Sequence, residues 1–176
     1  MYIKNLLLIA YLDLKESIRA KWFLVYSLVF GGMIALFFIA GVTQSQVMGF
    51  SGLSRLLLMY IQITIVILPI FILVTTVRSI SGDRDNHILE YMLSFPISLK
   101  QYYWGKIVGR FVTVFLPVFF AMFFAIIYGA TIKAEIPWGI FFLYSGLLFA
   151  LSSAFLGIAF FISSFVKSSE VALGIS

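Results

Sequence analysis

The residues best suited to chemistry or to charged contacts lie together in a short segment near the middle of the chain. Residues 78–90 hold five of the nineteen Asp, Glu, Lys and Arg residues, and long uncharged runs flank them on both sides. Such a segment could dock on the polar surface of a soluble partner, or supply acid–base groups to a small integral membrane enzyme. The residues that would act in either role are Asp83, Arg84, Asp85, His87 and Glu90.

Several other kinds of chemistry are excluded or disfavoured by what the sequence contains. His87 is the only histidine and the chain has no cysteine, so neither a metal site nor a cofactor is expected. The six methionines are scattered and fit core packing better than a thioether path for copper. A G-x-x-x-x-G-K-[ST] loop does not occur, so the chain does not bind ATP in the P-loop manner. We therefore interpret the chain as the membrane half of a machine whose energy source is another polypeptide.

The composition indicates a membrane protein. Hydrophobic residues make up 62% of the chain and charged residues 11%, whereas a soluble domain has about 25% charged residues. Four continuous apolar runs are each long enough to cross about 30 Å of hydrocarbon as a helix. We predict an all-α polytopic membrane protein, a single transmembrane domain over residues 1–176, with spans at residues 22–41, 56–77, 107–132 and 138–166.

The positions of Lys and Arg predict the orientation of these spans. If the N-terminus is cytoplasmic, ten of the twelve Lys and Arg residues lie inside and only Arg55 and Lys133 lie outside. This places residues 78–106 in the cytoplasm and residues 43–54 and 133–135 outside, in a protein of the plasma membrane. Because the positive charges cluster at the ends of apolar runs, the net charge of +5 reports topology and not nucleic-acid binding.

Residues 1–21 are predicted to form an amphipathic helix on the inner membrane surface. Apolar residues recur at helical spacing, whereas four charged residues fall between positions 13 and 19. The alternative, an extended first span, would bring those four charges into lipid. The expected apolar face comprises Ile3, Leu7, Ala10, Leu14 and Ile18.

The segment after the second span is predicted to contain two helices. Asp83 or Asp85 can cap a helix that runs to about Ser94, and Pro96 ends it. Ser98-Leu99-Lys100-Gln101 is a capping-box pattern that starts the next helix, which continues into the third span.

Small residues at helical spacing mark two expected packing surfaces. One is the pair Gly105 and Gly109 at the start of the third span. The other lies on the fourth span and comprises Gly146, Ala150 and Ala154. Each becomes a subunit interface only if another helix is available.

The charged segment resembles the first cytoplasmic loop of type-2 ABC-transporter permeases. The similar stretches are Gly82-Asp83-Arg84-Asp85 and Ile88-Leu89-Glu90-Tyr91-Met92-Leu93-Ser94-Phe95-Pro96-Ile97-Ser98. The stretch from Asp13 to Phe23 is similar to the first helix of that family. Within the family, the motifs are most similar to those of permeases that serve copper maturation of nitrous-oxide reductase. The sequence departs from the pattern at Asn86-His87, where the family commonly has a small polar pair.

The resemblance implies a transport subunit that is not itself an enzyme. Its partners would be a separate ABC ATP-binding subunit, which hydrolyses ATP, and a second permease in a homodimer or heterodimer. The coupling residues it implies are Asp83, Arg84, Asp85, His87, Glu90 and Met92. The residues expected to anchor the coupling helix are Leu89, Leu93, Pro96 and Ser98.

The family has six spans, whereas four are predicted here. The stretch from Glu170 to Ser176 has the character of the start of a fifth span, so we expect the chain to be incomplete at its C-terminus. Two other functions stay open from the residues alone. One is a non-transporting assembly or scaffold subunit of a membrane complex, and the other is the small membrane enzyme considered above.

Overall fold

The structure is a computed structural model that describes residues 2–40, 52–95, 97–131 and 133–165. Every regular element within these ranges is an α-helix, which confirms the predicted all-α class. In chain order the helices are α1 (Tyr2–Arg19), α2 (Trp22–Ile39), α3 (Gly52–Thr76), α4 (Ser79–Asp85), α5 (Ile88–Leu93), α6 (Leu99–Thr131) and α7 (Trp138–Phe165).

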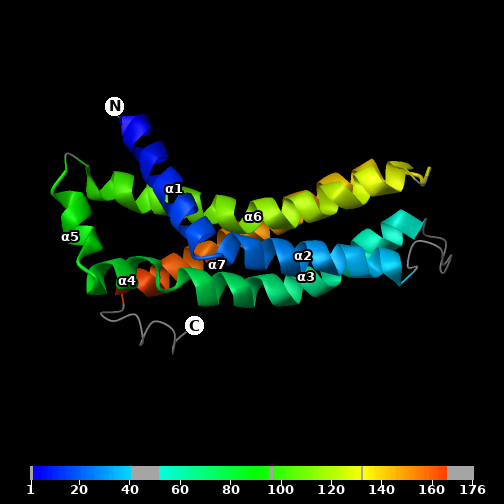
Figure 1. Ribbon diagram of the computed structural model, residues 1–176, viewed down its shortest axis with the longest axis horizontal. Coiled ribbons are helices and arrows are strands. Elements are labelled where there is room, and N and C mark those ends of the chain that lie inside the picture. Colours follow the sequence, from blue (N-terminus) through cyan, green and yellow to red (C-terminus); the bar gives the residue numbers. More distant parts are fainter. Residues whose placement is uncertain (1, 41–51, 96, 132, 166–176) are drawn as a thin grey trace.

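Four long helices, α2, α3, α6 and α7, run side by side and form the body of the molecule (Figure 1). Each is long and apolar enough to cross a membrane, which confirms the four predicted spans. Helix α6 begins at Leu99, well before the predicted start of the third span at residue 107, because the Ser98 cap sets its first turn. The short helices α4 and α5 lie together at one end of the bundle (Figure 1).

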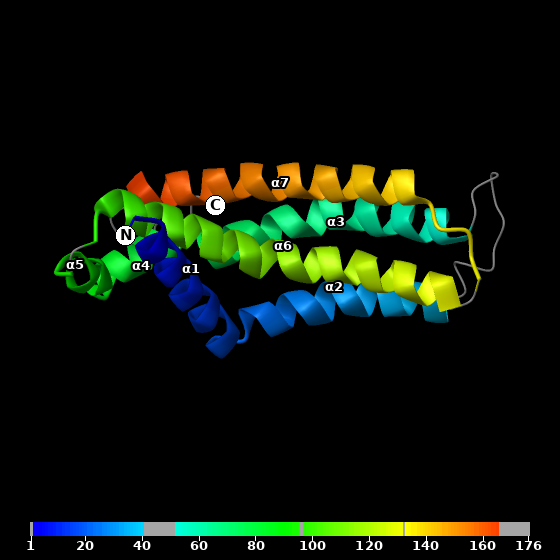
Figure 2. The same cartoon turned by 90° about the horizontal axis from the view of Figure 1, so that it is seen from above.

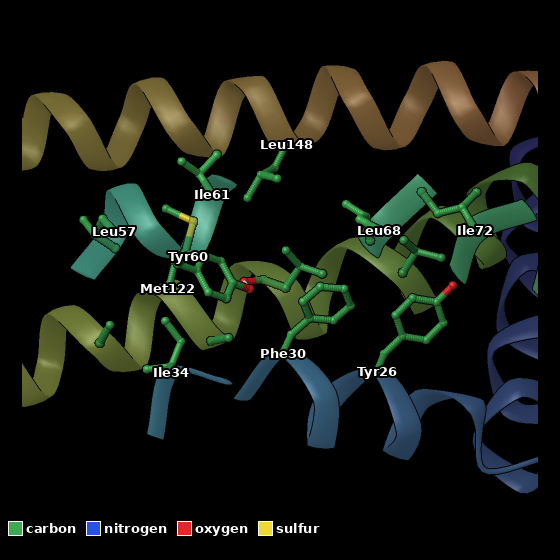
Figure 3. Packing of buried hydrophobic residues seen from close by; sticks show 14 of the residues in the cluster. Tyr26, Phe30, Ile34, Leu57, Tyr60, Ile61, Leu68, Ile72, Met122 and Leu148 are labelled. Carbon is green, nitrogen blue, oxygen red and sulfur yellow. The ribbon is translucent and has the colours of Figure 1, made fainter. Parts of the chain in front are cut away.

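The core between the long helices consists of aromatic and aliphatic side chains. Tyr26 of α2 lies beside Ile72 of α3, Tyr60 of α3 lies near Met122 of α6, and Leu148 of α7 closes the opposite side (Figure 3). The hydroxyl groups of the two core tyrosines are paired, as buried polar groups generally are. The Tyr60 hydroxyl donates a hydrogen bond to the carbonyl of residue 118 at 3.0 Å, and the Tyr26 hydroxyl lies 2.8 Å from the hydroxyl of residue 75.

Helix α1 is separate from α2 and crosses the bundle obliquely against α6 (Figure 2). The helical conformation is interrupted between α1 and α2 at Lys21, whose φ of 63° is left-handed. This confirms a distinct N-terminal helix, although its placement on a membrane surface stays a prediction. A Cβ atom on Gly105 would lie 2.7 Å from Ile9 and one on Gly109 would lie 2.8 Å from the carbonyl oxygen of Ala10. The two glycines therefore allow the close contact between α1 and α6.

The face of α1 that packs on α6 differs from the one predicted. Its buried residues are Ile9, Ala10, Asp13 and Ser17, whereas most of the predicted apolar face, including Ile3, Leu7 and Ile18, is exposed. The reason is that the contact with α6 selects for close approach and for charge pairing, not for hydrophobicity alone. The exposed apolar side chains of α1 remain available to lipid.

The predicted single helix from Asp83 or Asp85 to Ser94 is also wrong. Residues 86 and 87 separate α4 from α5, and His87 has a left-handed φ of 57°. Asp83 and Asp85 lie inside α4, and the first N–H groups of α4 are capped from another helix, as described below. By contrast, the predicted capping box at Ser98 is confirmed. The Gln101 side chain accepts from the Ser98 N–H at 2.9 Å, and the Ser98 hydroxyl accepts from the Gln101 N–H at 3.3 Å.

Candidate functional site: a buried charge cluster beneath an exposed helical segment

Four charged side chains from three helices meet inside the protein, and we call them the charge cluster. They are Asp13 of α1, Asp83 of α4, and Lys106 and Arg110 of α6. The Arg110 Nε lies 3.3 Å from Asp13 Oδ2, and the Lys106 Nζ lies 3.8 Å from Asp13 Oδ1. Lys106 also pairs directly with Asp83. Side-chain exposure is only 1% for Asp13 and 10% or less for the other three.

Helical spacing brings these side chains to one place. Lys106 and Arg110 are four residues apart and therefore share a face of α6, and Asp13 and Ser17 do the same on α1. Gly105 and Gly109 bring the α1 backbone close enough for the side chains to pair. The Arg110 Nη1 donates to the Ser17 hydroxyl at 3.1 Å, so Arg110 contacts two residues of α1 that are one turn apart.

Further hydrogen bonds attach α4 to the charge cluster. The Tyr102 hydroxyl donates to Asp83 Oδ2, and the Lys106 Nζ donates to the backbone carbonyl of Ser79 at 3.1 Å. Lys106 thus contacts two points of α4 and also Asp13 of α1. One lysine on α6 connects the N-terminal helix to the first turn of the charged segment.

The charge cluster contains two carboxylates and two cations, so its formal charges cancel. Burial raises the pKa of Asp13, and the positive charges of Arg110 and Lys106 oppose this rise. The ionised form of Asp13 therefore depends on both cations. Removal of one member of a buried ion pair typically costs about 3–5 kcal/mol, because the remaining charge is left unpaired.

A second connection joins α4 to the end of α7. The hydroxyl of Ser163 accepts hydrogen bonds from the backbone N–H groups of Ile80 and Ser81 at 3.0 and 3.1 Å. These N–H groups belong to the first turn of α4 and have no partner within a helix, so α7 supplies the cap that the sequence predicted from an aspartate. Arg84 also donates to the carbonyl of Ser164 at 3.4 Å.

The remaining predicted coupling residues lie at the surface. Arg84, Asp85, His87 and Glu90 are exposed, and Met92 is partly buried. His87 Nδ1 lies 2.9 Å from Glu90 Oε2, which links the turn before α5 to its first turn. Asp83 differs from the others, because it is buried and holds Lys106 and Tyr102.

The predicted anchoring residues are placed as follows. Leu89 is partly buried and lines a small cavity with Ile80 and Tyr102. Ser98 caps α6. The side chain of Leu93 and the whole of Pro96 lie outside the described residues. Their anchoring roles stay predictions.

The two small-residue surfaces differ in what they contact. Gly105 and Gly109 are filled by α1, as described above. Gly146, Ala150 and Ala154 of α7 are exposed, and no atom lies within 4 Å of a Cβ placed on Gly146. This small-residue surface of α7 is therefore exposed.

The charge cluster was not predicted from the sequence, in which Lys106 and Arg110 serve as markers of orientation. A signal was present in the spacing. Each cation directly follows a glycine, at Gly105-Lys106 and Gly109-Arg110, and Asp13 and Ser17 repeat the same four-residue interval on α1. Paired intervals of this kind indicate that two helices pack closely with charges between them.

The four apolar helices, the crossing N-terminal helix and the charged helical segment define a polytopic helical membrane protein. Residues 7–176 match the ABC-2 family transporter protein family, and the chain belongs to that family. It is similar to the probable ABC transporter permease protein NosY of Stutzerimonas stutzeri, with 25% identity over 163 residues. That alignment covers 93% of this chain and 59% of the relative, so the chain spans about three fifths of the relative's length.

Proposed function

We propose that the chain is a membrane-spanning permease subunit of an ATP-binding-cassette transporter, of the type-2 and export-like kind, in which a separate subunit hydrolyses ATP. The family match over residues 7–176 supports this proposal. The single observation that carries the mechanism is that an exposed helical segment is fixed from beneath by a buried charge cluster. The N-terminus and the α4–α5 segment face the cytoplasm of the plasma membrane in this proposal.

The exposed residues of α4 and α5 would contact the ATP-binding subunit. Arg84, Asp85, His87 and Glu90 offer both signs of charge, and Met92 adds an apolar contact. The paired His87 and Glu90 side chains hold the turn between the two short helices in one arrangement. A surface that is already ordered loses less conformational entropy when it binds.

Asp83 would act in coupling from inside the protein. A force on α4 passes through Asp83 and Lys106 to α6, and through Asp13 to α1. The Ser163 cap passes the same force to α7. Movement of the docked segment is thereby linked to two of the spans and to the N-terminal helix, without a flexible loop between them.

The second part of the proposal is pairing with another permease subunit, as a homodimer or as a heterodimer with a homologue. The exposed small residues of α7 support it, because Gly146, Ala150 and Ala154 allow another helix to approach closely. The lipid bilayer surrounds the rest of the apolar surface.

The test separates docking from transmission by using two sets of variants with the cognate ATP-binding subunit. Glu90→Lys, or Leu89→Asp together with Met92→Asp, should abolish co-purification of the ATP-binding subunit. Asp83→Asn should leave co-purification intact, yet change the rate of ATP hydrolysis of the complex relative to the free ATP-binding subunit. Lys100→Gln, an exposed change outside α4 and α5, is the matched control.

All variants are compared at equal membrane levels. Wild-type co-purification of the Glu90 and Leu89–Met92 variants would refute docking through this segment. A wild-type rate of ATP hydrolysis in the Asp83→Asn complex would refute transmission through the charge cluster.

A further inference from the structure

A cavity of about 360 Å³ opens beside the charge cluster, between the end of α1, the start of α2 and the junction of α3 with α4. Arg110 and Asp83 line its inner part, and each is only about one-tenth exposed. Glu16, Arg78 and Trp22 also line it. Its size falls within the range of cavities that hold small ligands, about 300–1,000 Å³.

The polar groups of this cavity are not all used by the protein itself. Arg78 and Glu16 are exposed, and neither side chain makes an ion pair or hydrogen bond within the described part of the chain. The cavity thus presents a free guanidinium and a separate free carboxylate.

These groups match a ligand that carries both an anion and a cation. A phosphate would accept hydrogen bonds from the Arg78 guanidinium, a charge-assisted contact that arginine makes well. An ammonium group would donate to the Glu16 carboxylate. A simple anion would leave Glu16 unpaired and would meet its negative charge, so the lining favours a phosphate–ammonium group over phosphate alone.

The position of the cavity indicates where such a ligand comes from. The cavity lies at the joint between α1, which is not a candidate span, and α2, a candidate span that begins at Trp22. Tryptophan beside a span end is typical of the lipid headgroup region. Val74 and Ile88 give the cavity apolar lining as well.

We propose that this cavity binds the phosphate–ammonium headgroup of a membrane lipid, of the phosphatidylethanolamine class, through Arg78 and Glu16. The ligand would sit against the same Asp83 and Arg110 side chains that join α4 to α6 and α1. This inference goes beyond the transport function proposed above and does not depend on the identity of the ATP-binding partner.

The test measures lipid binding to the purified, delipidated chain in detergent by native mass spectrometry. Phosphatidylethanolamine, phosphatidylglycerol and water-soluble glycerophosphoethanolamine are titrated separately. The wild-type chain should bind phosphatidylethanolamine about tenfold more tightly than phosphatidylglycerol, which corresponds to about 1.4 kcal/mol. Arg78→Gln should weaken binding of both lipids about tenfold. Glu16→Gln should weaken phosphatidylethanolamine alone and so remove the preference.

Arg19→Gln, at the exposed end of α1, is the matched control and should bind like the wild type. Arg78→Lys keeps the positive charge and should retain part of the affinity. This result would show that the loss of binding in Arg78→Gln is not a folding defect. Equal binding of both lipids by the wild type, or unchanged preference in Glu16→Gln, would overturn the proposal. Tight binding of glycerophosphoethanolamine without binding of the intact lipid would overturn its assignment to a membrane lipid.

Discussion

Replacement of Arg110 by methionine tests the reasoning about the charge cluster most directly. Methionine keeps much of the side-chain volume and removes the charge. At 3.3 Å, the Arg110–Asp13 attraction is about 5 kcal/mol for an effective dielectric constant of about 20. Part of the loss of this attraction is offset, because the variant has no guanidinium that must be dehydrated when the protein folds. We therefore expect Arg110→Met to lower the free energy of unfolding by about 3 kcal/mol, near the lower end for broken buried pairs.

The other half of the test uses Asp13. Because burial raises the pKa of Asp13, the neutral form of this side chain is less costly to bury than the ionised form. Asp13→Asn alone should cost less than Arg110→Met, and Asp13→Asn added to Arg110→Met should restore most of the lost stability. The measurement is the free energy of unfolding of the purified chain in mixed micelles, from denaturation by added dodecyl sulfate.

The pH dependence gives an independent check with a definite sign. A folded-state pKa above the unfolded value of 3.8 means that Asp13 adds stability at low pH and loses it as pH rises through the folded pKa. Arg110→Met removes the largest opposing charge and raises that pKa further. The variant should therefore gain stability as pH falls toward the unfolded value of 3.8, whereas the Asp13→Asn, Arg110→Met double variant should gain less. The pairing would be refuted if the two substitutions changed the free energy of unfolding additively and the double variant had the same pH profile as Arg110→Met.

Three further changes probe other parts of the fold. Gly109→Ala should lower the free energy of unfolding by about 1–3 kcal/mol, since its Cβ would overlap the carbonyl oxygen of Ala10 in α1. Gly146→Ala is the matched control, and equal effects of the two changes would contradict the close contact. Ser98→Ala should cost about 1 kcal/mol through loss of the cap of α6, and an unchanged unfolding energy would argue against that cap. In this cysteine-free chain, Asn86→Cys should react with an impermeant thiol reagent only in opened cells and Lys133→Cys in intact cells, and the reverse pattern would invert the proposed topology.

The sequence predicted the elements that depend on composition and on local signals. The four spans follow from continuous apolar runs, and the start of α6 follows from the short-range pairing of Ser98 and Gln101. What it did not predict depends on contacts distant in sequence. The cap of α4 comes from Ser163, more than eighty residues away, and that contact makes an aspartate cap unnecessary.

The face of α1 was mispredicted for a related reason. In a membrane protein an apolar face can point outward to lipid, so hydrophobic periodicity alone does not identify the packed side. Asp13 and Ser17 mark the packed side of α1, and their partner Arg110 lies on α6. Pairs of this kind can be recognised from one sequence only when small residues and charges repeat at the same interval on both helices.

The contact between α1 and α6 has a consequence for the order in which the protein assembles during synthesis. Ser17 and Arg110 are 93 residues apart, so the N-terminal helix leaves the ribosome long before its partner exists. Asp13 must therefore remain hydrated until α6 has been inserted, and only then can α1 settle onto Gly105 and Gly109. Helix α1 is thus made before α6 but reaches its final position only after α6 is in place, and a nascent chain arrested before α6 should leave Asp13 open to water.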